Sequence, residues 1–105
     1  TPGDQIRDFT YIDDVVHGLI LAMKSKNCFG ETLNLASGKP IKIREVVNQV
    51  VDIIGKGKPV FGGMNYRENE QMDLHADISK IQSKLNWTPS IDLESGLLET
   101  IQFYK

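Results

Sequence analysis

The stretch that decides the fold reads Ile6-Arg7-Asp8-Phe9-Thr10-Tyr11-Ile12-Asp13-Asp14-Val15. Its first seven residues alternate apolar and polar side chains and are rich in β-branched and aromatic types, which predicts a strand. The two aspartates predict the start of a helix, because their side-chain oxygens can accept hydrogen bonds from its first free N–H groups. Apolar residues then recur on one face of a helix that ends near Lys24 or Lys26: Val15, Leu19, Ala22 and Met23.

The next part of the chain repeats this order of strand and helix. Residues Glu31 to Ala36 alternate like a second short strand, and a turn at 37–40 closes it. A long helix follows from about Ile43 to Ile54, and Gly55 is suited to end it in the left-handed conformation. Lys42 stands where a capping box would place Ser or Thr, so this helix depends on its apolar face.

The last part predicts two more helices. Val60-Phe61 could form a brief strand, and the polar residues 62–71 predict a surface loop. Asp77 is a candidate cap for a helix that ends at Asn86, a residue that tolerates positive φ. Asp92 is a candidate cap for the final helix, whose apolar face comprises Leu93, Leu97, Ile101 and Tyr104. We therefore expect residues 1–105 to form a single α/β segment in which short strands alternate with about four helices.

Composition narrows the class of protein. The chain has 105 residues, 40% of them hydrophobic and 25% charged, as expected of one globular unit. A net charge of −2 argues against a nucleic-acid or anionic-membrane partner, because such binders carry clustered cations. No apolar stretch is long enough to span a membrane, and we expect a cytoplasmic location. The start at Thr1 lacks an initiator Met and a signal peptide, so we expect a processed start or a piece of a longer chain.

The residues capable of catalysis are few. His17 and His75 have no second ligand at metal-binding spacing, and structural roles are favoured for both. Cys28 is the single cysteine, which excludes an internal disulfide framework and a thiolate metal cluster. Asp13 and Asp14 could act as a metal or acid–base pair, although helix capping explains them as well. The segment 55–58 reads Gly-Lys-Gly-Lys but lacks phosphate-loop spacing, so a flexible connection is favoured.

Two arginines are stronger candidates. Arg7 lies within an apolar strand pattern, and Arg67 lies in the polar loop. A guanidinium is a rigid fork of donors that matches carboxylate or phosphate oxygens, so two of them could clamp a diphosphate. The alternative is that Arg7 pairs with a local acid and Arg67 with Glu70. Spacing alone favours neither.

Three motifs together resemble the C-terminal part of the extended short-chain dehydrogenases/reductases, the NAD(P)-dependent nucleotide-sugar epimerases and dehydratases. Residues 3–15, GDQIRDFTYIDDV, are similar to the family's G-x-Q-x-R-D-F-x-Y-V-x-D. Residues 30–38, GETLNLASG, are similar to G-E-x-Y-N-I-G-S-G. Residues 77–80, 85–89 and 93–97 read DISK, LNWTP and LESGL, and resemble D-x-S-K, L-G-W-x-P and L-E-x-G-L. The resemblance extends over nearly the whole chain.

The resemblance implies roles for five residues. The arginines that match Arg7 and Arg67 contact the diphosphate of a nucleotide sugar in that family. Glu70 matches an acidic position that often meets the ribose hydroxyls, and Gln5 and Phe9 lie where ligand contacts are expected. The family's usual R-x-G-D is Arg-Glu-Asn-Glu at residues 67–70.

The family's redox centre has no counterpart in this sequence. Neither the glycine-rich fingerprint of the cofactor site nor the catalytic Tyr-x-x-x-Lys is present. The resemblance therefore implies the C-terminal substrate-binding lobe of a longer enzyme, whose NAD(P) is bound by residues outside this chain and whose members are often homodimers. In that family an upstream Tyr deprotonates a sugar hydroxyl while the nicotinamide accepts hydride. The alternative is a non-catalytic α/β module that binds a nucleotide or a protein.

Overall fold

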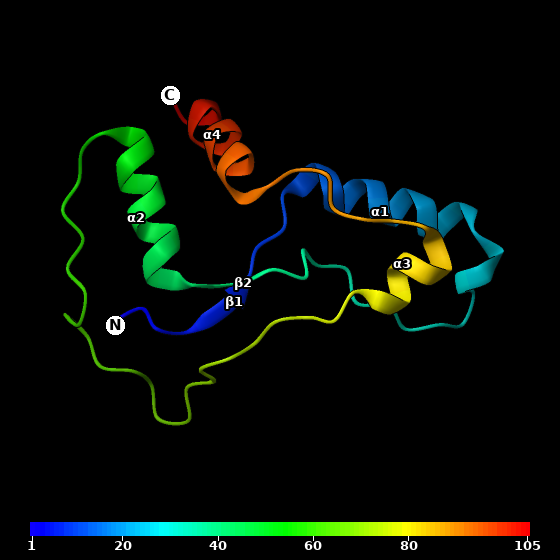
Figure 1. The fold of residues 1–105 in the computed structure, drawn as a ribbon, viewed down its shortest axis with the longest axis horizontal. Helices are drawn as coiled ribbons and strands as arrows, with labels where there is room; N and C mark the ends of the chain where they lie inside the picture. Colours follow the sequence, from blue (N-terminus) through cyan, green and yellow to red (C-terminus); the bar gives the residue numbers. More distant parts are fainter.

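Four helices and a small sheet make up the computed structural model, which describes all residues from Thr1 to Lys105 (Figure 1). Helix α1 (Ile12–Lys24), the short 3-10 helix η1 (Lys26–Cys28) and α3 (Ser79–Leu85) lie at one end. Helices α2 (Ile43–Ile54) and α4 (Leu93–Phe103) lie at the other, with strands β1 (Ile6–Asp8) and β2 (Pro40–Lys42) between the two groups. No helix combines the length and the apolar character needed to cross a bilayer. The fold is mixed α/β, as predicted.

The elements form an open plate. Its extents are 48 × 36 × 16 Å, and its radius of gyration is 16.2 Å, against about 13 Å for a compact domain of 100 residues. Eight of the 105 residues are buried. One face of α1 is exposed along its length, and its apolar side chains are Ile12, Val16, Leu19, Ile20 and Met23.

Strand β1 is the centre of the plate. It pairs with β2 in antiparallel register, with Arg7 opposite Ile41. On its other edge, the Ile6 N–H donates to the Met72 carbonyl at 2.7 Å and the Leu74 N–H donates to the Ile6 carbonyl at 3.0 Å. These two hydrogen bonds hold residues 72–74 beside β1.

The strand predictions were only partly right. The predicted strand 6–12 is shortened to β1, because the helix already begins at Ile12. Residues 31–36 form no ladder, although Leu33 and Leu35 pack against the core and their polar neighbours are exposed. Residues 60–61 form no strand either. Alternation identified which side chains face inward, but a strand also needs a partner for its backbone.

The core lies between α1 and α3. Ile81, Leu85 and Trp87 are 2%, 8% and 1% exposed, and partly buried apolar side chains pack around them. The Trp87 indole N–H donates to the Asp14 carbonyl at 3.1 Å, which satisfies its one polar atom.

The two aspartates at the start of α1 do not cap it, which corrects the prediction. The N-cap is Tyr11, without a side-chain hydrogen bond, and Asp14 lies inside the first turn. The Asp14 carboxylate is buried and accepts hydrogen bonds from the Ser90 N–H and hydroxyl and from the Ile91 N–H, at 2.9–3.1 Å. Burial opposes its ionisation, but these hydrogen bonds outweigh burial and lower the pKa of Asp14. Asp14 therefore ties α1 to the segment that precedes α4.

The other helix ends agree better with the sequence. Gly55 and Asn86 end α2 and α3 in the left-handed conformation, with φ of 77° and 52°. Asp92 caps α4 by accepting from the Ser95 N–H at 2.8 Å. Lys42 provides no side-chain cap for α2. The Asp77 carboxylate accepts from the Ser79 N–H at 2.9 Å, although the N-cap position of α3 is Ile78.

Candidate functional site

The predicted residues at β1 occupy alternate positions, Gln5, Arg7 and Phe9, which in an extended chain share one face. Phe9 is 39% exposed, and the Arg7 side chain is 25% exposed. Gln5 is buried, and its amide donates to the Thr1 hydroxyl at 3.2 Å. The surface beside β1 therefore offers a cation and an aromatic ring.

Arg7 forms an ion pair with Glu70. Its Nη2 lies 3.1 Å from Glu70 Oε1, and its Nη1 donates to the Ile6 carbonyl at 2.8 Å. Both side chains are largely shielded from solvent. Two of the five predicted site residues are thus in contact, whereas the alternative ion pair of Arg67 with Glu70 does not form.

Arg67 is the first residue of the turn that ends at Glu70, the partner of Arg7. The Glu70 N–H donates to the Arg67 carbonyl at 3.1 Å, which closes the turn. Asn69 takes a φ of 63°, so it supplies the left-handed backbone for which glycine is usual. The Arg67 side chain is exposed and forms no ion pair with the chain. Its guanidinium is free to bind an anion.

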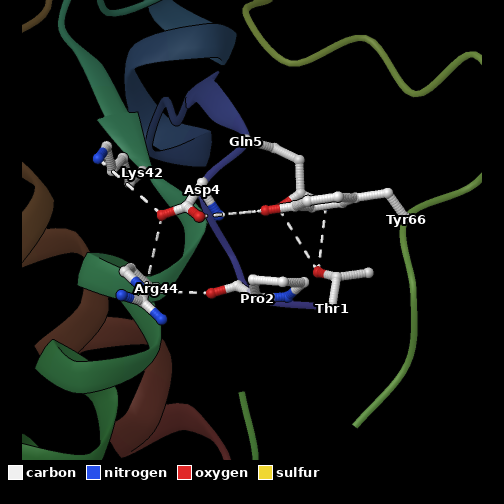
Figure 2. Close-up of polar contacts among 7 residues, drawn as sticks. All are labelled: Thr1, Pro2, Asp4, Gln5, Lys42, Arg44 and Tyr66. Atoms are coloured by element: carbon white, nitrogen blue, oxygen red, sulfur yellow. Dashed lines mark hydrogen bonds and ion pairs between the residues drawn. The ribbon is translucent and has the colours of Figure 1, made fainter. Parts of the chain in front are cut away.

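A second polar contact holds this turn from its N-terminal side. The Asp4 N–H donates to the Tyr66 hydroxyl oxygen at 3.1 Å, and that hydroxyl donates to Asp4 Oδ2 at 3.3 Å. Figure 2 shows Tyr66 reaching Asp4 from the loop, while Lys42 and Arg44 approach from the opposite side. Their nitrogens lie 4.0 and 3.9 Å from Asp4 Oδ1. Sequence analysis did not identify Asp4 or Tyr66, because nothing in the sequence indicates that they meet.

Gly3 allows the chain before β1 to approach α2 closely. Its φ is 81°, and a Cβ there would lie 2.9 Å from the Arg44 Cβ. Arg44 donates from Nε to the Pro2 carbonyl at 3.1 Å and lies over the Phe61 ring at 4.9 Å. Arg44, in the first turn of α2, thus contacts both the start of the chain and the loop.

A cavity of about 700 Å³ lies elsewhere, between β2, α2 and the start of α4. Phe9 is the one predicted site residue in its lining. Four carboxylates line it against a single cation, Lys39; they are Glu45, Asp52, Asp92 and Glu94. Such an acidic lining disfavours an anionic ligand such as a diphosphate.

The histidines and the cysteine, which the sequence offered as possible catalytic residues, show no catalytic arrangement. His75 Nδ1 lies 2.6 Å from Asp73 Oδ1, and the Cys28 thiol donates to the Ala22 carbonyl at 3.2 Å. His17 is exposed on α1. No group of three or more His, Cys, Asp or Glu side chains could hold a metal ion.

Known proteins resemble this chain over almost all of its length. A UDP-glucuronate 4-epimerase of Thermodesulfobacterium geofontis is 39% identical over 98% of the chain and 31% of the relative. A putative UDP-glucose 4-epimerase of Methanocaldococcus jannaschii is 33% identical over 98% of the chain and 32% of the relative. The chain thus spans about a third of the length of these relatives.

Solved structures of similar enzymes also superpose on this chain. The UDP-glucose 4-epimerase of Thermotoga maritima, crystallised with UDP-glucose, superposes with a TM-score of 0.85 at 28% identity, over 97% of this chain and 32% of that one. The UDP-glucuronic acid 4-epimerase of Bacillus cereus, crystallised with NAD, gives 0.74 at 34% identity, over 91% and 29%. The family model described as GDP-mannose 4,6 dehydratase matches residues 2–100. The chain therefore belongs to this family of NAD-dependent epimerases and dehydratases, the extended short-chain dehydrogenases/reductases, and matches a part of its members' length.

Proposed function

We propose that residues 1–105 are the C-terminal lobe of an NAD(P)-dependent sugar-nucleotide epimerase or dehydratase, and that this lobe binds the nucleotide diphosphate of the substrate. The observation that carries the proposal is the exposed guanidinium of Arg67, which forms no ion pair and begins the turn that ends at Glu70, the partner of Arg7. The solved relative from Thermotoga maritima holds UDP-glucose, which supports the class of ligand.

Each side chain has a separate task in this proposal. Arg7 is oriented by its bonds to Ile6 and Glu70, so its remaining N–H groups are directed before a ligand arrives. Arg67 supplies the second fork for the diphosphate. Glu70 has no partner at Oε2, which leaves that oxygen to accept a ribose hydroxyl. Phe9 offers an exposed ring, and a ligand contact by Gln5 stays a prediction.

Binding at these residues lies away from the reacting carbon of a sugar. Interactions with the non-reacting part of a substrate hold it in the geometry that reaction needs. The lobe would therefore act by orienting the sugar, while other residues of the enzyme perform the chemistry.

The residues of this chain do not fit a dinucleotide cofactor. Such a cofactor binds at a glycine-rich turn between a strand and a helix. Here α1 follows β1 through Phe9, Thr10 and Tyr11, and α2 follows β2 directly. The Gly-Lys-Gly-Lys segment begins at the C-terminal end of α2, not at a helix start. We therefore propose that NAD(P) is bound by residues outside the chain. A cytoplasmic location and a homodimeric enzyme also stay predictions.

Titration of the complete enzyme with UDP, CDP, GDP and dTDP tests the proposal. We expect one of them to bind, and Arg67→Ala to weaken that binding by about 1.5–3 kcal/mol, the scale of a hydrogen bond to a charged group. Lys56→Ala removes an exposed cation from the same long connection and should leave the affinity unchanged. Equal affinities of the wild type and Arg67→Ala would contradict the role of Arg67. Binding without epimerase or dehydratase activity in the complete protein would favour the non-catalytic module.

A further inference from the structure

The turn that carries Arg67 lies in a long connection with little regular structure. Residues 55–78 run around the outside of the plate from α2 to α3 (Figure 1). On the C-terminal side of the turn, the bridge between Ile6 and Asp73 fixes the connection to β1. Before the turn, the nearest backbone hydrogen bond to the rest of the chain is the one that the Gly62 N–H donates to the Thr1 carbonyl at 3.0 Å, five residues ahead of Arg67. Without a further contact, residues 63–66 would be free to move and Arg67 with them.

Tyr66 supplies the anchor on the N-terminal side. Its hydroxyl both accepts from the Asp4 N–H and donates to Asp4 Oδ2, so both hydrogen-bonding functions are used by one residue (Figure 2). This double contact fixes the ring, and with it the backbone that leads directly into Arg67. The other contacts of the loop with the chain start lie further upstream, at Phe61 and Gly62.

Asp4 is itself held in one orientation. Lys42 from the end of β2 and Arg44 from the first turn of α2 place positive charges beside Oδ1, which leaves Oδ2 directed to Tyr66. The carbonyls of the residues on either side of Asp4 are also bonded to the start of α2, because the Arg44 N–H donates to the Gly3 carbonyl at 2.9 Å and the Ile43 N–H to the Gln5 carbonyl at 3.0 Å. Tyr66 is therefore attached to a rigid part of the plate.

We propose that Asp4 and Tyr66 are positioning residues that hold the Arg67–Glu70 turn in place, so that the exposed Arg67 guanidinium is ready for a nucleoside diphosphate. The inference rests on the proposed function and adds to it residues that do not touch the ligand. Two anchored ends restrict the turn before binding, and less conformational entropy is then lost when Arg67 engages the phosphates.

Tyr66→Phe in the complete enzyme tests this inference, because it keeps the ring and removes the hydroxyl. We expect affinity for the nucleoside diphosphate that binds the wild type to fall roughly threefold to tenfold, the equivalent of one hydrogen bond. Tyr104→Phe removes an exposed hydroxyl that has no partner and should bind like the wild type. Asp4→Asn and Asp4→Ala lose the same charge, but only asparagine keeps an oxygen for the Tyr66 hydroxyl. Asp4→Asn should therefore bind more tightly than Asp4→Ala.

A second set of measurements separates positioning from a general loss of structure. If Tyr66 acts through Arg67, Tyr66→Phe should have no further effect on affinity in the Arg67→Ala background. The Glu70 amide, which bonds to the Arg67 carbonyl, should exchange its hydrogen faster in Tyr66→Phe. An equal loss of affinity in both backgrounds, or none in either, would overturn the inference.

The two proposals fail differently. If the wild type binds no nucleoside diphosphate, or Arg67→Ala binds as tightly as the wild type, the proposed function is wrong and the inference falls with it. If Arg67→Ala loses affinity while Tyr66→Phe does not, the inference alone is overturned.

Discussion

The guanidinium of Arg7 and the carboxylate of Glu70 meet at 3.1 Å although the two residues lie 63 positions apart in the chain. The contact exists because residues 72–74 return to the free edge of β1 and bring the preceding turn with them. It joins a strand near the start of the chain to the loop that carries Arg67. The candidate site is therefore a product of sheet pairing.

Glu70→Ala should lower the free energy of unfolding by about 1 kcal/mol, because it leaves the partly buried Arg7 guanidinium without its carboxylate. Urea unfolding at neutral pH measures the change. Glu68→Ala removes an exposed carboxylate from the same turn, one that forms no ion pair, and serves as the control. Similar losses in the two variants would show that the Arg7–Glu70 contact contributes nothing specific.

Asp14 should make the fold sensitive to acid. Its pKa is lower in the folded chain than its ordinary value of 3.8, so its contribution to stability is complete above that value. The contribution is lost as pH falls from about 4 through the lower folded pKa. Asp14→Asn should therefore be less stable than the wild type at neutral pH and lose less of its stability below pH 4. Urea midpoints between pH 7 and pH 3 measure both effects, and Asp13→Asn, at the exposed neighbour, is the matched control.

Gly18→Ala should destabilise the protein although alanine favours helices. A Cβ at Gly18 would lie 2.5 Å from Leu35 Cδ1 and 3.2 Å from Trp87 Nε1. Overpacking of this kind costs about 1–3 kcal/mol, more than the gain of up to about 1 kcal/mol in helix propensity. Thermal melts followed by the fluorescence of Trp87 give the change. His17→Ala, at the exposed neighbouring position, should be tolerated; a Gly18→Ala variant as stable as the wild type would mean that Leu35 moves aside without cost.

The turn before Glu70 should accept glycine at position 69 but not alanine. Asn69 has a φ of 63°, a conformation that glycine adopts freely and that costs alanine about 1–2 kcal/mol. Asn69→Gly should keep nucleotide affinity and stability near the wild type, while Asn69→Ala should lower both. Calorimetric titration and urea unfolding measure the two quantities, and Asn65→Ala is the control in the same loop. An Asn69→Ala variant equal to Asn69→Gly would contradict the assigned backbone strain.

The helices could be predicted because their signals are local. The apolar face of α2 and its left-handed end at Gly55 are set by residues within a few turns of one another, and the Asp92 cap needs only Ser95. The prediction failed at Asp14. An aspartate at the start of a helix is a usual capping residue, but the Asp14 carboxylate accepts its hydrogen bonds from residues 76 and 77 positions later in the chain. No local pattern distinguishes the two uses.

The sheet and the candidate site depend on distant partners, which alternation does not identify. The sequence predicted the importance of Arg7 and Arg67, and its family motifs predicted that of Glu70. It did not predict that Arg7 pairs with Glu70, nor that Tyr66 binds Asp4. The predicted turn at 37–40 was followed directly by the helix, so residues 40–42 were not predicted as a strand, yet they pair with β1.

The 16 Å thickness of the plate also determines how these 105 residues would respond to heat. A layer so thin keeps much of its apolar surface hydrated in the native state, as the exposed face of α1 shows. Unfolding the layer alone would hydrate little additional apolar surface, so its heat-capacity increment should fall below the about 12–15 cal/mol/K per residue of ordinary globular domains. A small increment gives a shallow stability curve, and the unfolding enthalpy of the isolated layer would vary little with temperature.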